Sequence, residues 1–149
     1  MPKAKQRNPS SGWKSYEVTE RTQTGEPGAC PFSDALATSG RIAKQAITKM
    51  LKAQEIGWPA ARSAMKDDIG RRLIAKKDDD IWLLKCKPNC WRLYFYVWEK
   101  EDDKRIIYVH AVCKQTDEED PSDLATARAV LNSIRPGGRA ITPFEFPTR

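Results

Sequence analysis

The stretch "IWLLKCKPNCWRLYFYVWEKEDDKRIIYVHAVCKQ", residues 81–115, decides the fold of this chain. Three runs within it, at 81–87, 90–99 and 105–115, are rich in the β-branched and aromatic residues that favour strands. The short polar segments "PN" and "KEDDK" separate these runs and are typical of hairpin turns. The sequence therefore predicts three consecutive antiparallel strands.

A helical pattern precedes these strands. We expect a helix to begin at Ser33, because serine is a preferred N-cap residue. Its apolar residues recur at helical spacings, at Leu36, Ala43, Ile47, Met50 and Leu51. Gly57 and Pro59 predict its end, and Pro59 also suits the first turn of a second, short helix. Residues 66–80 are charged and include a glycine, which indicates a loop or a fraying helix.

Another helix is expected after the strands, with Asp120 as its N-cap and Pro121 at its first position. Its apolar stripe consists of Leu124, Ala127, Leu131 and Ile134. Near the two ends of the chain, 13–20 reads as a short strand. Residues 140–146 read as an edge strand or a tail, because their prolines exclude a central position in a sheet.

These elements predict one α+β domain. We expect a mixed, mainly antiparallel sheet, with the N-terminal helices and the C-terminal helix packed on one face of it. The domain is expected to cover residues 13–135. Residues 1–12 have the composition of a disordered basic tail, and 136–149 form a C-terminal tail or edge strand.

Successive side chains of a strand point to opposite faces of a sheet, so each run can be divided between two faces. One predicted face is apolar and forms the core under the helices: Trp82, Leu84, Cys86, Leu93, Phe95, Val97, Ile107, Val109, Ala111 and Cys113. The other collects cations, aromatic rings and the lone histidine: Lys85, Lys87, Arg92, Tyr94, Tyr96, Trp98, Tyr108, His110 and Lys114.

Cations interleaved with aromatic rings suit single-stranded nucleic acid, because cations meet phosphates and rings stack on bases. RNA can be cleaved on such a face without a metal. Arg92 is the candidate ligand of the phosphorane, His110 the candidate proton carrier, and Lys85 and Lys114 supply further positive charge. Tyr94, Tyr96 and Tyr108, with Lys87, are the candidate substrate-binding residues. The alternative is that the rings form cross-strand pairs and that His110 is a polar residue without chemistry.

Other sequence features indicate whether the protein binds a metal, where it is located and what kind of partner it has. The spacing of Cys86 and Cys90 is compatible with zinc, but no second Cys/His pair lies near, so small buried thiols are favoured and no metal or cofactor is expected. No apolar run approaches a membrane span, and the basic N-terminus lacks the apolar segment of a secretory signal. Four irregularly spaced cysteines suit a reducing compartment, so we expect a cytoplasmic protein. A net charge of +6 weakly favours a polyanionic partner.

The blocks "IWLLK", "WRLYFY", "IIYVHAVCKQT" and "PSDLATARAVL" occur in this order. In order and spacing, the sequence over roughly residues 34–134 resembles the phage-derived, HigB-like branch of the RelE/ParE toxin superfamily. The resemblance implies a small RelE-like toxin that cleaves mRNA on the ribosome and is neutralised by a cognate antitoxin in a hetero-oligomer. The positions that match the family's functional ones are Lys85, Arg92, Tyr94 or Phe95, His110 and Lys114. Two rival functions are a non-enzymatic toxin of this fold that poisons a protein such as DNA gyrase, and a degenerate member that only binds a partner.

Overall fold

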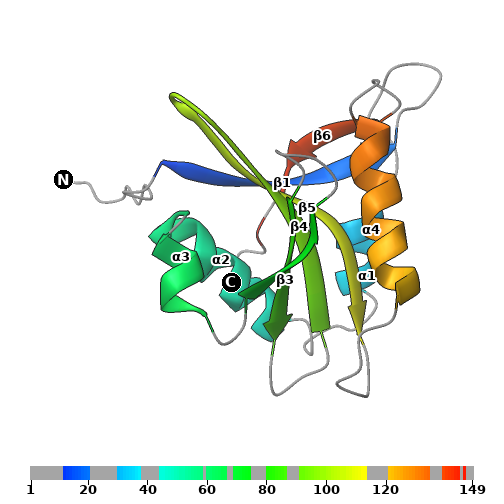
Figure 1. Ribbon diagram of the computed structural model, residues 1–149, viewed down its shortest axis with the longest axis horizontal. Coiled ribbons are helices and arrows are strands. Elements are labelled where there is room, and N and C mark those ends of the chain that lie inside the picture. The colour runs from blue at the N-terminus through cyan, green and yellow to red at the C-terminus, as the bar shows by residue number, and fades with distance from the viewer. Residues whose placement is uncertain are drawn as a thin grey trace.

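The computed structural model describes residues 12–20, 30–37, 44–58, 60–66, 69–74, 80–86, 91–113, 121–134, 139–144 and 146 (Figure 1). The strands are β1 (Trp13–Glu20), β2 (Ile69–Ile74), β3 (Asp80–Cys86), β4 (Trp91–Lys100), β5 (Asp103–Cys113) and β6 (Arg139–Pro143). The helices are α1 (Pro31–Ala37), α2 (Lys44–Ile56), α3 (Ala60–Ala64) and α4 (Pro121–Ile134). Residues 1–11 of the predicted disordered tail and Asp120, the predicted N-cap, lie outside the described residues.

The strands form one six-stranded mixed sheet in the order β2-β3-β4-β5-β1-β6. β3, β4 and β5 are the three predicted antiparallel strands, and this prediction is confirmed. The predicted strand at 13–20 is also confirmed: β1 lies inside the sheet, parallel to β5 and antiparallel to β6. β6 is an edge strand, as expected from its prolines.

β2 was not predicted. The sequence there indicated a loop or fraying helix, but Ile69–Ile74 pairs antiparallel with β3. The charged residues of "IGRRLI" hid the strand, because they match neither an apolar run nor a clean alternation. An edge strand tolerates such residues, since one of its sides faces no other strand.

The helices cover both faces of the sheet. α1, α2 and α3 lie on one face, where their buried residues join those of β3 and β4, whereas α4 lies on the opposite face (Figure 1). The prediction that all helices pack on one face is therefore wrong. The helices lie on both faces because both faces carry apolar side chains that must be buried. On the α4 face, Ile81, Leu83 and Ile107 are at most 4% exposed.

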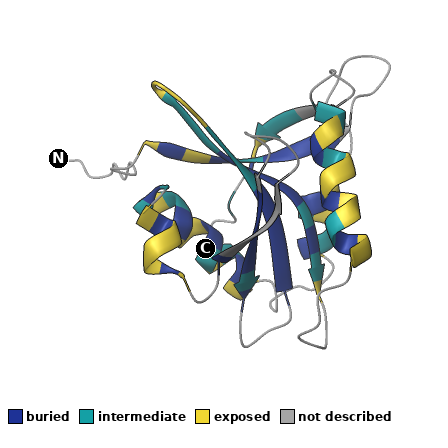
Figure 2. Cartoon of the chain, viewed as in Figure 1, coloured by how far each residue is buried: buried dark blue, intermediate teal, exposed yellow. Residues whose placement is uncertain are grey.

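Two cores result. Under α1–α3 the sheet contributes Trp13, Trp82, Leu84, Cys86, Trp91, Leu93, Phe95, Ile106, Tyr108 and Ala111. Under α4 it contributes Val18, Ile81, Leu83, Tyr94, Ile107 and Val109. Figure 2 shows the buried residues along the central strands and the exposed residues on the outer sides of α2, α3 and α4.

A β-bulge in β5 changes which of its residues share a face of the sheet, so the observed faces differ from the predicted ones. Tyr94 pairs with His110, but the next residue, Phe95, pairs with Tyr108, so Val109 is the extra residue. Alternation predicts that Tyr108 and His110 share a face, and this is wrong. Tyr108 packs in the α1–α3 core, while His110 lies on the α4 face. The same shift moves Ile107 and Val109 to the α4 face.

The N-terminal helical region contains α1 and α2, and residues 38–43 between them, with Ala43 of the predicted stripe, lie outside the described residues. α1 begins at Pro31, and the Cys30 carbonyl accepts the first helical bond from the Asp34 N–H at 2.9 Å. Leu51, placed in the predicted apolar stripe, is 36% exposed. The end of α2 is as predicted, because Gly57 has a φ of +84° and its N–H donates to the Ala53 carbonyl at 2.9 Å.

The α4 stripe is confirmed, with Ala127 and Leu131 buried. Cys113 differs from its prediction as a buried thiol, because it is exposed at the end of β5 and is disulfide-bonded. Cys86 is a buried free thiol. Among the described residues, no helix is long and apolar enough to span a membrane.

Candidate functional site

Two neighbouring rungs of the sheet bring the predicted site residues together. In the first, Lys85 of β3 pairs with Arg92 of β4. In the second, Tyr94 of β4 pairs with His110 of β5. Residues directly opposite one another have Cβ atoms about 5 Å apart and share a face. Lys85, Arg92, Tyr94 and His110 therefore form one patch on the α4 face, near the end of β5 that leads to α4.

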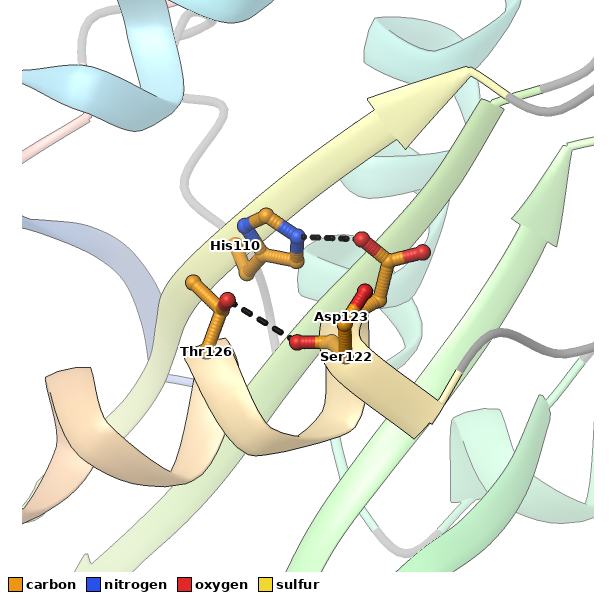
Figure 3. Close-up of polar contacts among 4 residues, drawn as sticks. All are labelled: His110, Ser122, Asp123 and Thr126. Carbon is orange, nitrogen blue, oxygen red and sulfur yellow. Dashed lines mark hydrogen bonds and ion pairs between the residues drawn. The ribbon is translucent and has the colours of Figure 1, made fainter.

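α4 contributes a further member, Asp123. Its Oδ1 lies 3.1 Å from His110 Nε2, and the two side chains are 12% and 21% exposed (Figure 3). An ionised carboxylate can only accept, so Nε2 carries the proton in this contact. In a neutral ring this makes Nδ1 the basic atom. Asp123 therefore orients the imidazole.

The sequence did not identify this role for Asp123. An acidic residue in the first turn of a helix is ordinarily explained by the helix dipole and by capping. The contact depends on where α4 crosses β5, and no local pattern contains that information. Thr126, one turn further along α4, instead donates to the Ser122 carbonyl at 2.9 Å (Figure 3).

Tyr94 supports the histidine. The two ring centroids are 5.7 Å apart, with the planes at 35°. Tyr94 is 0% exposed, so its ring is not available to stack on a base. Its contribution is to hold the imidazole from the sheet side while Asp123 holds it from the helix side.

The two cations of the patch, Arg92 and Lys85, differ in how far solvent can reach them. Arg92 is 5% exposed, whereas Lys85 is half-buried. Lys49 of α2, the helix that packs on the opposite face of the sheet, donates from Nζ to the Lys85 carbonyl oxygen at 3.4 Å. Lys85 and His110 are therefore the members of the patch that solvent can reach.

The remaining predicted residues lie elsewhere. Tyr108 is 0% exposed in the other core and stacks on Phe32 at 5.0 Å, so it cannot contact a substrate on the α4 face. Tyr96 is half-buried on the α4 face, further towards the β4–β5 turn. Lys87 and Lys114 lie outside the described residues.

A second polar group lies under α1 and was also missed. The Glu17 carboxylate is buried, with the residue 4% exposed. It accepts from the Ser33 N–H at 3.1 Å and from Ser33 Oγ at 2.6–2.7 Å. Burial raises the pKa of the neighbouring Cys30 thiol, and the charges of Glu17 and Asp34 add to this, against a hydrogen bond with Thr19. Because Glu17 satisfies the first turn of α1, its role is structural.

No group of three or more His, Cys, Asp or Glu side chains that could hold a metal ion occurs in the part of the chain that the structure describes. Comparison of the chain with protein-family models, with curated proteins and with solved structures gave no match.

Proposed function

We propose that this chain is an endoribonuclease toxin of the RelE/HigB-like kind, which cleaves mRNA on the ribosome without a metal and is neutralised by a cognate antitoxin. The observation that carries the proposal is the His110–Asp123 pair beside the Lys85–Arg92 rung. A histidine held by a carboxylate is suited to proton transfer, and adjacent cations are suited to a phosphate.

The proposed reaction uses these groups in order. His110 Nδ1 takes the proton of the RNA 2′-hydroxyl, and Asp123 stabilises the resulting imidazolium. The 2′-oxygen bonds to phosphorus as the bond from phosphorus to the 5′-oxygen breaks. Because the chain holds a single histidine, Lys85 or a water protonates the departing oxygen. The products are a 2′,3′-cyclic phosphate and a 5′-hydroxyl end.

Access decides the roles of the two cations. Lys85 is half-buried and lies in the rung next to His110, so we assign it the direct contact with the phosphate. Arg92 is 5% exposed, so its main contribution is the positive potential of a buried guanidinium under the patch. Only its small exposed part can contact the phosphorane.

The experiment compares the wild-type chain with His110→Gln, Asp123→Asn and Thr126→Ala. Each is expressed inducibly, and new mRNA 5′-hydroxyl ends are mapped. The purified proteins are then incubated in EDTA with naked RNA and with mRNA in a translation extract. We expect His110→Gln to lower cleavage by about 100-fold or more, within the range for a general base. Asp123→Asn should have a smaller effect, and Thr126→Ala, an exposed α4 residue bonded to backbone, should cleave as wild type.

A second candidate function has its own support. The burial of Arg92 and Tyr94 favours a protein of this fold that binds and poisons a protein partner, or only binds one, without cleaving RNA. Growth arrest without new 5′ ends would favour that candidate and reject the nuclease. Cleavage that survives His110→Gln would retain the nuclease and reject the assigned base.

A further inference from the structure

Cys113, the last residue of β5, has an exposed side chain and is disulfide-bonded. The sequence has four cysteines, of which Cys30 and Cys86 are free thiols. Cys86 is also too distant, because Trp91 pairs with Cys86 on one side and with Cys113 on the other, which places their Cα atoms about 10 Å apart. The fourth cysteine, Cys90, lies outside the described residues and directly precedes Trp91 in the chain. Cys90 is therefore the remaining candidate partner within the chain.

A bond between Cys90 and Cys113 closes the open end of the β4–β5 hairpin, which is the end that carries the candidate patch. Trp91 pairs with Cys113, and the next rung pairs Arg92 with Val112. His110 precedes Cys113 by three residues in the same strand. The bond therefore lies beside the patch, at the opposite end of the hairpin from the turn at residues 101–102.

This end of β5 has fewer strand neighbours than the rest of the strand. Among the described residues, β1 pairs with β5 only at residues 104–108, so residues 109–113 pair with β4 alone. Segments with few hydrogen-bonded and packed neighbours open locally at a low cost in free energy. A covalent bond at Cys113 therefore supplies an attachment at the place where the sheet holds β5 on one side.

The contact between His110 and Asp123 depends on this end of β5. Val112 packs against the core under α4, and His110, on the same face, has its Nε2 3.1 Å from Asp123 Oδ1 (Figure 3). Residues 114–120, which follow Cys113, lead directly to α4. Local opening of β5 at its end would therefore withdraw both Val112 and His110 from the first turns of α4.

We propose that Cys90 and Cys113 form a reversible redox clasp: the disulfide keeps the His110–Asp123 pair assembled, and its reduction lets the pair separate. The effect of the clasp on RNA cleavage rests on the proposed function, whereas its effect on the histidine does not. Exposed disulfides are the ones that exchange readily with other thiols. In a reducing compartment, which the cysteine content suits, such a bond is ordinarily transient. Oxidising conditions therefore assemble the site, and reducing conditions disassemble it.

Both directions of the switch use ordinary thiol chemistry. A thiolate of a dithiol reductant attacks one sulfur of the clasp, the S–S bond breaks, and a mixed disulfide forms. The second thiolate of the reductant then displaces the remaining cysteine, so that the reductant leaves as a cyclic disulfide after giving two electrons, and each cysteine takes up a proton. In the other direction, a peroxide oxidises one cysteine to a sulfenic acid and leaves as water. The second thiol attacks this sulfur, the disulfide forms, and a second water is released.

The first measurement identifies the bond. The wild type, Cys90→Ser, Cys113→Ser and the control Cys30→Ser are oxidised with stoichiometric hydrogen peroxide, digested without reductant and analysed by mass spectrometry. The wild type and Cys30→Ser should yield a linked pair of peptides that contain Cys90 and Cys113, and an excess of reduced glutathione should separate them. Reduction should lower Tm by about 10 °C. A bond between two copies of the chain, or a bond that persists in excess glutathione, would overturn the inference.

The second measurement follows the ring signals of His110 by NMR, in the oxidised protein and after addition of dithiothreitol. On reduction, these signals should move towards their positions in Asp123→Asn. Cys90→Ser and Cys113→Ser should show the moved signals with or without dithiothreitol, whereas Cys30→Ser should respond as the wild type does. Circular dichroism confirms that the reduced wild type is folded, so that the change reports on the site. Unchanged His110 signals in protein that has gained two titratable thiols would reject the clasp.

Cleavage separates the clasp from the proposed nuclease. In a translation extract depleted of thiols, reduction of the protein should lower mRNA cleavage by about 10-fold or more, because a small displacement of a reacting group is costly. Cys30→Ser should lose activity on reduction to the same extent. A wild type that does not cleave, but whose His110 signals respond, rejects the nuclease and retains the clasp. A wild type that cleaves equally in both redox states with unchanged signals retains the nuclease and rejects the clasp.

Discussion

Replacing Tyr108 by phenylalanine tests the account of the bulge and of the core beneath α1. Tyr108 is 0% exposed, and its hydroxyl has no hydrogen-bond partner within the described part of the chain. Its ring stacks on Phe32 at 5.0 Å and lies 5.7 Å from that of Phe95. Phenylalanine keeps these ring contacts and removes only the unpaired hydroxyl. Burying such a group costs about 1–3 kcal/mol, so we expect Tyr108→Phe to increase the free energy of unfolding by about 1 kcal/mol.

The increase in the free energy of unfolding caused by Tyr108→Phe should be larger at high pH. Burial raises the pKa of the Tyr108 phenol well above its usual value, and the charge of Cys86 adds to this. In the unfolded chain the phenol loses its proton near pH 10, whereas the folded chain keeps it. Above that pH the unfolded state binds fewer protons, so the wild type loses about 1.4 kcal/mol of stability per pH unit from this group. The advantage of Tyr108→Phe should therefore rise to about 2 kcal/mol at pH 11.

Urea unfolding at pH 8 and pH 11 measures both effects, and thermal unfolding at pH 8 should show a Tm about 3 °C higher. Tyr96→Phe, at a half-buried ring on β4, is the control and should change stability by less than about 0.5 kcal/mol at pH 8. A Tyr108→Phe variant that is less stable than wild type by 1 kcal/mol would mean that the hydroxyl is bonded. A difference that is the same at both pH values would mean that the phenol ionises in the folded protein. Either result would contradict a buried Tyr108 hydroxyl that is unpaired and stays protonated in the folded protein.

Three further predictions follow from the contacts described. Glu17→Ala should lower stability by about 2–4 kcal/mol in urea unfolding, because it removes charged hydrogen bonds to the first turn of α1, whereas Ser33→Ala should cost less. Cys30 should react with iodoacetamide at pH 8 more slowly than a free thiol, because its raised pKa lowers the thiolate fraction, and Glu17→Gln should speed the reaction; equal rates for the two proteins would contradict the role of the Glu17 charge. Asp123→Asn should shift the His110 ring signals in NMR spectra, because the carboxylate contact at 3.1 Å is lost, while Thr126→Ala leaves them unchanged.

The elements that the sequence predicted are those with a strong local signal. β3, β4 and β5 consist of β-branched and aromatic residues, and the stripe around Ala127 and Leu131 has helical spacing. Such signals identify an element but not the face on which it packs. The second core escaped prediction for this reason, since α4 has the same pattern whichever face of the sheet it covers.

The candidate site was predicted in part. Pairing across β3 and β4 follows from alternation, so Lys85 and Arg92 were correctly expected to lie together. Tyr108 was assigned to the wrong face because Val109 and His110 are both compatible with a regular strand, and nothing local marks a bulge there. Asp123 was missed because its contact joins residues 13 positions apart through the crossing of α4 over β5.

The position of β1 has a consequence for how this molecule is made. β1 precedes both of its neighbours in the chain, since it pairs on one side with β5 and on the other with β6. Until residue 103 has emerged, β1 has neither neighbour, and the antiparallel hairpins of β2–β5 can form only without it. Pairings so distant in sequence slow folding, because loop-closure entropy is lost before the contacts form. The patch that carries His110 is completed later still, because Asp123 lies on α4, which follows β5 in the chain.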